Sequence, residues 1–126
     1  MEIDPTYVRI KEFAASEGYE AMRELMQLPQ RPEAVFTSNY ALTLGAFQFL
    51  KDHGYRIPRD IAFIGYDETP WSTIVDPPLS VIRYPMHEMG EAIGAMILDL
   101  VGSREHDRAR TVAFEPELVV RKSCGC

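Results

Sequence analysis

Two short runs of apolar residues, 34–37 and 61–66, lie on either side of a longer segment, 42–53, whose apolar residues recur at helical spacing. Short apolar runs with β-branched and aromatic residues are typical of interior parallel strands, which are buried on both faces. Neighbouring parallel strands need a crossover connection, and 42–53 is long enough to form one as a helix. The alternation predicts an α/β fold with a three-layer, doubly wound, mostly parallel sheet.

The remaining segments fit the same alternation. Ser16 is placed to cap a helix over 15–28, and Gly54 stands where a C-terminal cap of the 42–53 helix belongs. The segment 70–79 is rich in proline, so it cannot be helical throughout. The other expected elements are an extended segment over 79–83, a helix over 86–101, a charged loop over 103–110, and short strands over 111–114 and 118–121.

The 126 residues are enough for one domain. With 13 basic and 19 acidic side chains the net charge is -6, which repels the phosphate backbone of DNA rather than neutralising it. No apolar run reaches the roughly 18 to 20 residues that span a bilayer, and the sequence does not open with a basic stretch followed by an apolar one. We therefore expect a cytoplasmic protein with no membrane contact and no DNA binding by this chain alone.

The cysteines and histidines give no sign of a metal site. Cys124 and Cys126 are separated by one residue, too few for an unstrained disulfide that closes a useful loop, so we expect reduced thiols. The histidines at 53, 87 and 106 lack the paired spacing of zinc ligands. No metal and no cofactor is expected.

Polar residues follow both buried strands. Ser38 and Asn39 come after the first strand, and Asp67 and Glu68 come after the second. Ligands of open α/β sheets bind beyond the carboxyl ends of the strands, where an amide and a carboxylate suit the paired hydroxyls of a sugar. Trp71 could add an apolar stacking face. In the alternative interpretation Asn39 and Asp67 are helix caps or turn residues, and Trp71 belongs to the core or to a subunit contact.

Catalysis has little support in the sequence. There is no G-x-S-x-G elbow, no glycine-rich phosphate loop, and no histidine near a serine or cysteine nucleophile. Asp67 and Glu68 are adjacent at a strand exit and should point in different directions, which does not suit paired acid-base work. We expect that the chain is not an enzyme, and a small α/β enzyme is the least favoured alternative.

Four ordered blocks, at 32–46, 54–68, 76–85 and 116–123, resemble the C-terminal region of the lactose/galactose repressor (LacI/GalR) family of bacterial transcriptional regulators. The first opens P-E-A-V-F-T-S-N-Y-A and the third reads D-P-P-L-S-V-I-R-Y-P. The blocks stand in family order and spacing, and the resemblance covers nearly the whole chain from Gly18 onward. It implies a periplasmic-binding-protein-like effector domain.

The resemblance also implies a function. The family joins an N-terminal helix-turn-helix to a two-lobed sensor, so this chain would be the effector-binding and dimerisation part of a repressor responsive to a sugar or a similar small molecule. Asn39 and Asp67 would hydrogen-bond the effector, Tyr84 would reach it, and Trp71 would lie near the cleft. Tyr40 and Tyr84 depart from the usual aspartate and glutamine, so the effector is not specified. The alternative is a periplasmic sugar-binding protein of a transport system.

Two segments, 41–49 and 74–79, match regions that pair subunits in the family. Leu44, Phe47 and Val75 are the expected contacts of a homodimer, although simple core packing explains the same residues equally well.

By the same resemblance, the chain begins inside the second lobe, without that lobe's opening strand and helix, and carries no DNA-binding segment. Residues 84–110 would belong to the other lobe. The 86–101 helix would then lack its usual partner for an apolar stripe, and we expect self-association or a longer protein to cover it. The stripe consists of Met89, Ile93, Met96, Ile97 and Leu100.

Overall fold

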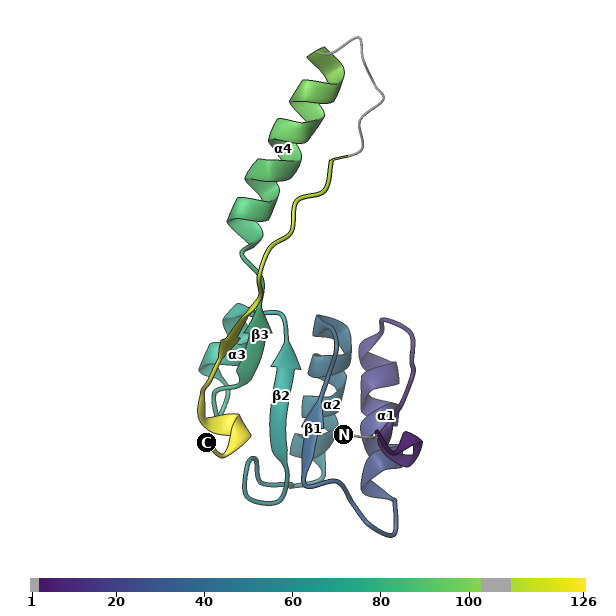
Figure 1. Ribbon diagram of the computed structural model, residues 1–126. Coiled ribbons are helices and arrows are strands. Elements are labelled where there is room, and N and C mark those ends of the chain that lie inside the picture. The colour runs from purple at the N-terminus through teal and green to yellow at the C-terminus, as the bar shows by residue number, and fades with distance from the viewer. Residues whose placement is uncertain (1–2, 103–109) are drawn as a thin grey trace.

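The computed structural model describes residues 3–102 and 110–126, which form an α/β body and one helix that projects from it (Figure 1). The expected charged loop falls mainly on 103–109, outside the described residues. In the part of the chain that the structure describes, no helix is long and apolar enough to cross a bilayer.

The body is built on a four-stranded sheet in the order β1-β2-β3-β4. β1, β2 and β3 run parallel, with Val35 beside Phe63 and Gly65 beside Val81, whereas β4 pairs antiparallel with β3. The mostly parallel sheet confirms the predicted fold class. Its strands are β1 (Ala34–Phe36), β2 (Ala62–Tyr66), β3 (Ser80–Arg83) and β4 (Glu117–Val119).

One expected strand is absent. The segment 111–114 has no strand structure, and β4 covers only the start of the second expected strand, 118–121. Residues 111–114 form no strand because the neighbouring strand, β3, is too short to pair with them. β4 pairs with residues up to Arg83 in β3, and beyond that residue the neighbouring chain turns into a helix, so 111–114 has no strand edge to bond.

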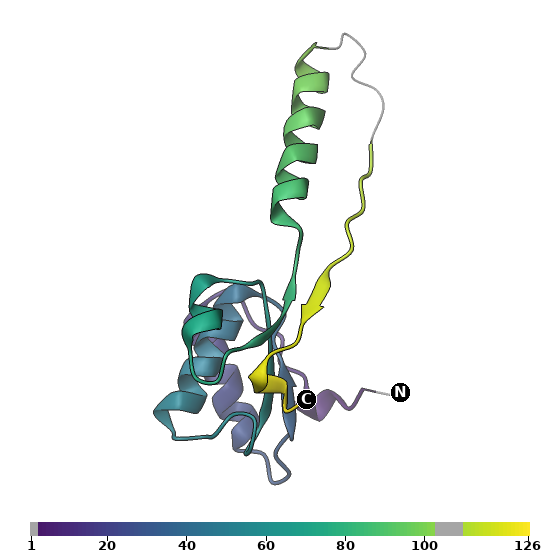
Figure 2. The same ribbon diagram turned by 90° about the vertical axis from the view of Figure 1, so that its left-hand side faces the viewer.

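Helices α1 (Ala15–Met26), α2 (Tyr40–Asp52) and α3 (Pro70–Ile74) cover one face of the sheet, as the side view shows (Figure 2). The core lies between these helices and the sheet, where Phe63, Leu79 and Val81 are fully buried. On the opposite side lies the 3-10 turn η1 (Pro5–Tyr7), whereas a second 3-10 turn, η2 (Lys122–Cys124), lies beside β2 and the start of β3, which Ser123 contacts. Of the three predicted layers, the described residues therefore build the sheet and one helical layer.

Of the two predicted helix caps, the one at Ser16 is wrong. α1 begins at Ala15, so Ser16 is already helical, and the residue at the cap position, Ala14, makes no side-chain hydrogen bond. Gly54 follows α2 with a φ of 71°, and its N–H donates to the Lys51 carbonyl. This confirms the expected glycine at the end of that helix.

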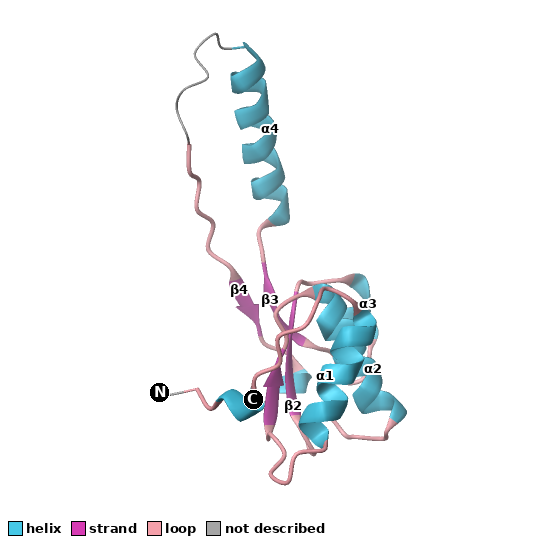
Figure 3. Cartoon of the chain, turned by 90° about the vertical axis from the view of Figure 1, so that its right-hand side faces the viewer, coloured by secondary structure: helices cyan, strands magenta, loops and turns pink. Residues whose placement is uncertain are grey.

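Helix α4 (Met86–Gly102) stands away from the body in all three views, and none of its residues is buried (Figure 3). The stripe residues Ile93, Ile97 and Leu100 are 55%, 54% and 49% exposed. Large apolar side chains are rarely left in such a row without a partner. The helix predicted over 86–101 is confirmed, and its apolar stripe has no cover among the described residues.

Candidate functional site

The carboxyl ends of the three parallel strands lie together at the end of the sheet from which α4 rises (Figure 1). Asn39 precedes α2, Asp67 directly follows β2, and Tyr84 directly follows β3. The sheet thus brings the strand-end residues singled out in the sequence to one edge. This edge is where open α/β sheets bind small molecules.

Asn39 begins α2 with its carboxamide. Its Oδ1 accepts a hydrogen bond from the Leu42 backbone N–H at 2.9 Å, which is the cap expected in the alternative interpretation. Its Nδ2 is buried and has no partner among the described residues. A buried donor without an acceptor is costly, so this amide nitrogen is suited to an incoming acceptor. The same side chain can cap the helix and present a donor.

Asp67 links the end of β2 to the start of α2. Its φ of 68° places the backbone in the left-handed region, which aspartate tolerates better than most residues. Its N–H donates to the Ile82 carbonyl at 3.0 Å, and its Oδ2 accepts from the Tyr40 N–H at 3.2 Å. Because Tyr40 follows Asn39, the carboxylate lies beside the residue that carries the free amide donor.

Thr43 links the residue that begins α2 to the end of β2 by hydrogen bonds, a role that the sequence analysis did not predict. Its hydroxyl donates to the Asn39 carbonyl at 2.7 Å and accepts from the Tyr66 N–H at 3.1 Å. Thr37 adds a buried hydroxyl at 2.8 Å from the same oxygen. A side chain on Gly65 would come within 2.6 Å of the Thr43 methyl group. The signal in the sequence is a threonine in an apolar helix together with a glycine in a buried strand.

Tyr84 turns its hydroxyl toward the hydroxyl of Tyr66 on the neighbouring strand, and the two rings meet edge to face with centroids 5.3 Å apart. Tyr66 in turn meets the ring of Phe36 at 6.0 Å. The three aromatic residues therefore form a row across the ends of β1, β2 and β3. A contact from Tyr84 to an effector stays a prediction.

Trp71, in α3, packs on Phe47 of α2 with ring centroids 5.6 Å apart, and its indole Nε1 is buried without a partner among the described residues. Phe47 is only 7% exposed and belongs to the core, as the core-packing alternative expects. Leu44 and Val75 are half-buried. Their role in a dimer stays a prediction.

Glu68 faces away from Asp67 and toward two arginines, as expected for adjacent residues at a strand exit. Arg83 donates to its carboxylate at 2.8 Å and to Glu117 at 2.6 Å, and Arg121 makes a second ion pair with Glu68. Hydrogen bonds from Arg121 and then Arg83 hold the pKa of the Glu68 carboxyl below its usual value of 4.5. This cluster joins the two chain segments that connect the body to α4.

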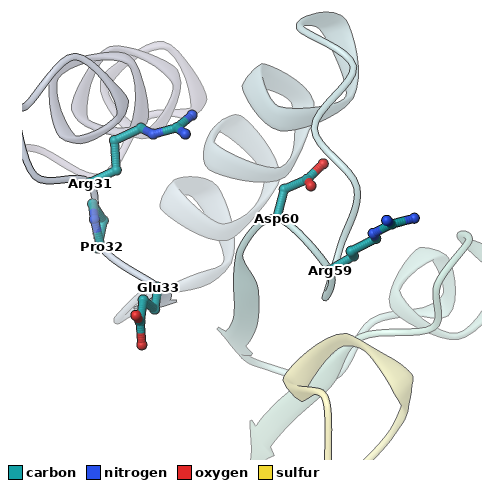
Figure 4. Close-up of a pocket in the computed structure, with 5 residues that line it drawn as sticks. All are labelled: Arg31, Pro32, Glu33, Arg59 and Asp60. Carbon is teal, nitrogen blue, oxygen red and sulfur yellow. The ribbon is translucent and has the colours of Figure 1, made fainter.

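A separate polar hollow of about 470 Å³ lies at the opposite, amino ends of β1 and β2 (Figure 4). Arg31, Glu33, Arg59 and Asp60 are among its lining residues. Arg56 bonds the Asp60 carboxylate through its side chain and its backbone N–H, which lowers the pKa of Asp60 to about 2. Two arginines and two carboxylates line the hollow, which lies at the other end of the strands from the edge where ligands bind in such folds.

Within residues 3–102 and 110–126 no three His, Cys, Asp or Glu side chains gather as metal ligands.

The sequence matches the periplasmic binding protein-like domain family over residues 1–124. It is 37% identical over 111 residues to the HTH-type transcriptional repressor PurR of Mannheimia succiniciproducens, which is 88% of this chain and 33% of that protein. It is also 40% identical to the ribose operon repressor of Escherichia coli over 98 residues. These residues cover 77% of this chain and 30% of that protein.

The structure is similar to that of the transcriptional regulator CelR in complex with cellobiose, with a TM-score of 0.84 and 32% identity over 98% of this chain and 37% of that one. The chain thus spans about a third of the length of the relatives it matches. It belongs to the periplasmic binding protein-like domain family, and its relatives are transcriptional repressors of the lactose/galactose repressor (LacI/GalR) type that the sequence blocks resemble.

Proposed function

We propose that the chain is the effector-sensing part of a bacterial transcriptional repressor that responds to a sugar or a similar polyhydroxy molecule. Relatives such as PurR and the ribose operon repressor are transcriptional repressors, and one similar structure holds cellobiose. They favour this function over the transport alternative and over an enzyme. DNA would be bound by another segment of the repressor, and a repressor of this kind acts in the cytoplasm.

The observation that supports effector binding most directly is the pairing of Asn39 and Asp67 at one edge of the sheet. Asn39 offers a buried amide donor that lacks an acceptor, and the neighbouring Asp67 offers a carboxylate. A ligand hydroxyl can accept from the amide and donate to the carboxylate, so adjacent hydroxyls of a sugar satisfy both groups. Sugars present such hydroxyls in fixed geometry.

The proposal includes a second lobe. We assign residues 84–110 to it, and α4 rises from the same end of the sheet at which the strands before Asn39 and Asp67 end, so a lobe built around α4 would stand over that edge. An effector held between the two lobes would change their closure and so the presentation of DNA-binding segments in a homodimer. Half-buried Leu44 and Val75 are the residues we assign to the subunit contact.

The test uses the complete repressor, screened against mono- and disaccharides that include ribose and cellobiose, first by thermal shift and then by calorimetry. Asn39→Asp keeps an oxygen for the Leu42 N–H but removes the amide donor, whereas Asn39→Ala removes both. We expect Asn39→Asp to weaken sugar binding by about tenfold or more, with little change in the free energy of unfolding. Unchanged affinity in both Asn39→Asp and Asp67→Asn would refute the assigned site.

A further inference from the structure

The segment after β4 carries two cysteines on a turn that is tightly fixed to the sheet. Cys124 ends η2, and Gly125 then adopts a left-handed φ of 78°, which reverses the chain. The reversal brings the Cys126 thiol back to the Cys124 carbonyl, with sulfur and oxygen 3.9 Å apart. Gly125 is the residue that permits this turn, because other residues rarely adopt such a φ.

Cys124 is held by its neighbours in the chain. The fully buried Ser123 hydroxyl accepts from the Ser80 N–H at 2.7 Å and donates to the Phe63 carbonyl at 2.6 Å. The Arg121 N–H donates to the Ser80 hydroxyl at 2.8 Å. These bonds connect η2 to the two central strands, so the position of Cys124 is set by the sheet. Cys126 is exposed and is not held in this way.

The two thiols differ in chemical character. Hydrogen bonds from Cys126 and from Ser80 lower the pKa of the Cys124 thiol, whereas the Cys124 side chain raises the pKa of the Cys126 thiol. Thiolates rather than thiols attack disulfides. We therefore assign the attacking role to Cys124, and the exposed Cys126, whose sulfur lies 3.9 Å from the Cys124 carbonyl oxygen, is within reach to resolve the product.

We propose that Cys124 and Cys126 form a redox-active dithiol that exchanges with small-molecule disulfides such as oxidised glutathione. The Cys124 thiolate attacks the exogenous disulfide, which forms a mixed disulfide and releases one thiolate. Cys126 then loses its proton to solvent and attacks the Cys124 sulfur, which releases the second thiolate. The two cysteines are oxidised to one disulfide, and one exogenous disulfide is reduced to two thiols.

This pair fits a reversible sensor better than a structural staple. A disulfide between residues separated by one position closes a very small loop, so it constrains the unfolded chain little and stores strain. Strained, exposed disulfides have higher reduction potentials and are the labile ones. The bond would form only when the surrounding thiol pool becomes oxidising and would open again when the pool recovers.

The test equilibrates the chain with mixtures of reduced and oxidised glutathione, quenches with acid, alkylates free thiols and measures intact mass. In the native chain we expect a non-alkylated species that is lighter by two hydrogen atoms, with no stable glutathione adduct, and full return to the dithiol with excess reduced glutathione. Cys126→Ser is expected to trap glutathione on Cys124, because the resolving thiol is gone. Cys124→Ser is expected to keep glutathione on Cys126, because no second thiol remains to release it.

Circular dichroism of both serine variants checks that the body stays folded, which we expect because neither cysteine belongs to the core. Stable glutathione adducts or disulfide-linked dimers as the main product of the native chain would overturn the proposal.

Discussion

At the scale of single residues, two interpretations of a strand-end side chain need not exclude each other. Asn39 uses Oδ1 as a helix cap and leaves Nδ2 buried without a partner among the described residues. Capping therefore does not remove the residue from the binding site, because an amide carries both an acceptor and donors. The same cap fixes the direction in which the donor points. Asp67 and Glu68 are adjacent but have different partners: Asp67 accepts a hydrogen bond from the start of α2, and Glu68 forms ion pairs with arginines.

Glu68→Gln tests the ion cluster between the body and α4. The substitution removes the charge that pairs with Arg83 and Arg121, and we expect the free energy of unfolding at neutral pH to fall by about 1 kcal/mol. The folded-state pKa of Glu68 is lowered, so its stabilisation is present above the usual value of 4.5 and is lost as pH falls through the lower folded value.

Urea denaturation of Glu68→Gln and the native chain at several pH values measures this difference. The two curves are expected to converge in acid, where Glu68 is protonated in both states. Glu12→Gln, which changes an exposed carboxylate ahead of α1, is the matched control and should shift stability little. A difference that persists unchanged in acid would contradict the ion-pair explanation.

At the scale of elements, α1 and α2 cross at two glycines. A Cβ on Gly45 would lie 1.8 Å from the Ala15 carbonyl oxygen, and one on Gly18 would lie 2.4 Å from the Leu42 carbonyl oxygen. Backbone atoms occupy both places, so no side-chain rotation can make room. The close crossing sets where α2 begins, and hence where Asn39 stands relative to Asp67.

Gly45→Ala is expected to lower the free energy of unfolding by about 2 kcal/mol, because the two helices must separate. Gly94→Ala makes the same change inside α4, where a Cβ would meet no atom within 4 Å. There alanine favours the helix by about 1 kcal/mol, so stability should be unchanged or slightly higher. Chemical denaturation followed by circular dichroism measures both, and equal effects of the two variants would refute the close-crossing explanation.

At the scale of the whole molecule, the body has a buried core whereas α4 has none. Met22, Leu50, Ile61 and Phe63 are at most 1% exposed in the body. No residue of α4 is buried, although its apolar residues repeat along one side. Burial of each large side chain of this kind contributes roughly 1.5 to 3 kcal/mol. Any arrangement that buries the apolar side chains of α4 therefore lowers the free energy of the chain.

The isolated chain is expected to self-associate through α4. Size-exclusion chromatography with light scattering should give a mass of at least two chains that rises with concentration. Ile97→Glu places a charge on the exposed stripe and should shift the chain toward a monomer, whereas Glu91→Gln, also exposed on α4, should not. A compact monomer of the native chain at all concentrations would contradict this prediction.

Local patterns were sufficient to predict most elements and the strand-end residues. Apolar runs and helical spacing are properties of neighbouring residues, so β1, β2, α2 and α4 could be located from the sequence alone. Asn39 and Asp67 could be placed at one edge because parallel strands end on the same side of a sheet. Gly54 could be predicted as the end of a helix because the residue after a helix often adopts a left-handed φ, which glycine allows.

Contacts between residues far apart in the sequence could not be predicted without the folded arrangement of the chain. Residues 111–114 form no strand because β3 ends at Arg83 and offers them no partner, which their own composition cannot show. The pairing of Glu68 with Arg121 joins residues 53 positions apart, and the Thr43 support of Tyr66 depends on how closely α2 packs on β2. Such contacts depend on how segments far apart in the sequence pack together. Helices and strands depend mainly on the preferences of neighbouring residues, so the sequence predicts the elements better than the contacts between them.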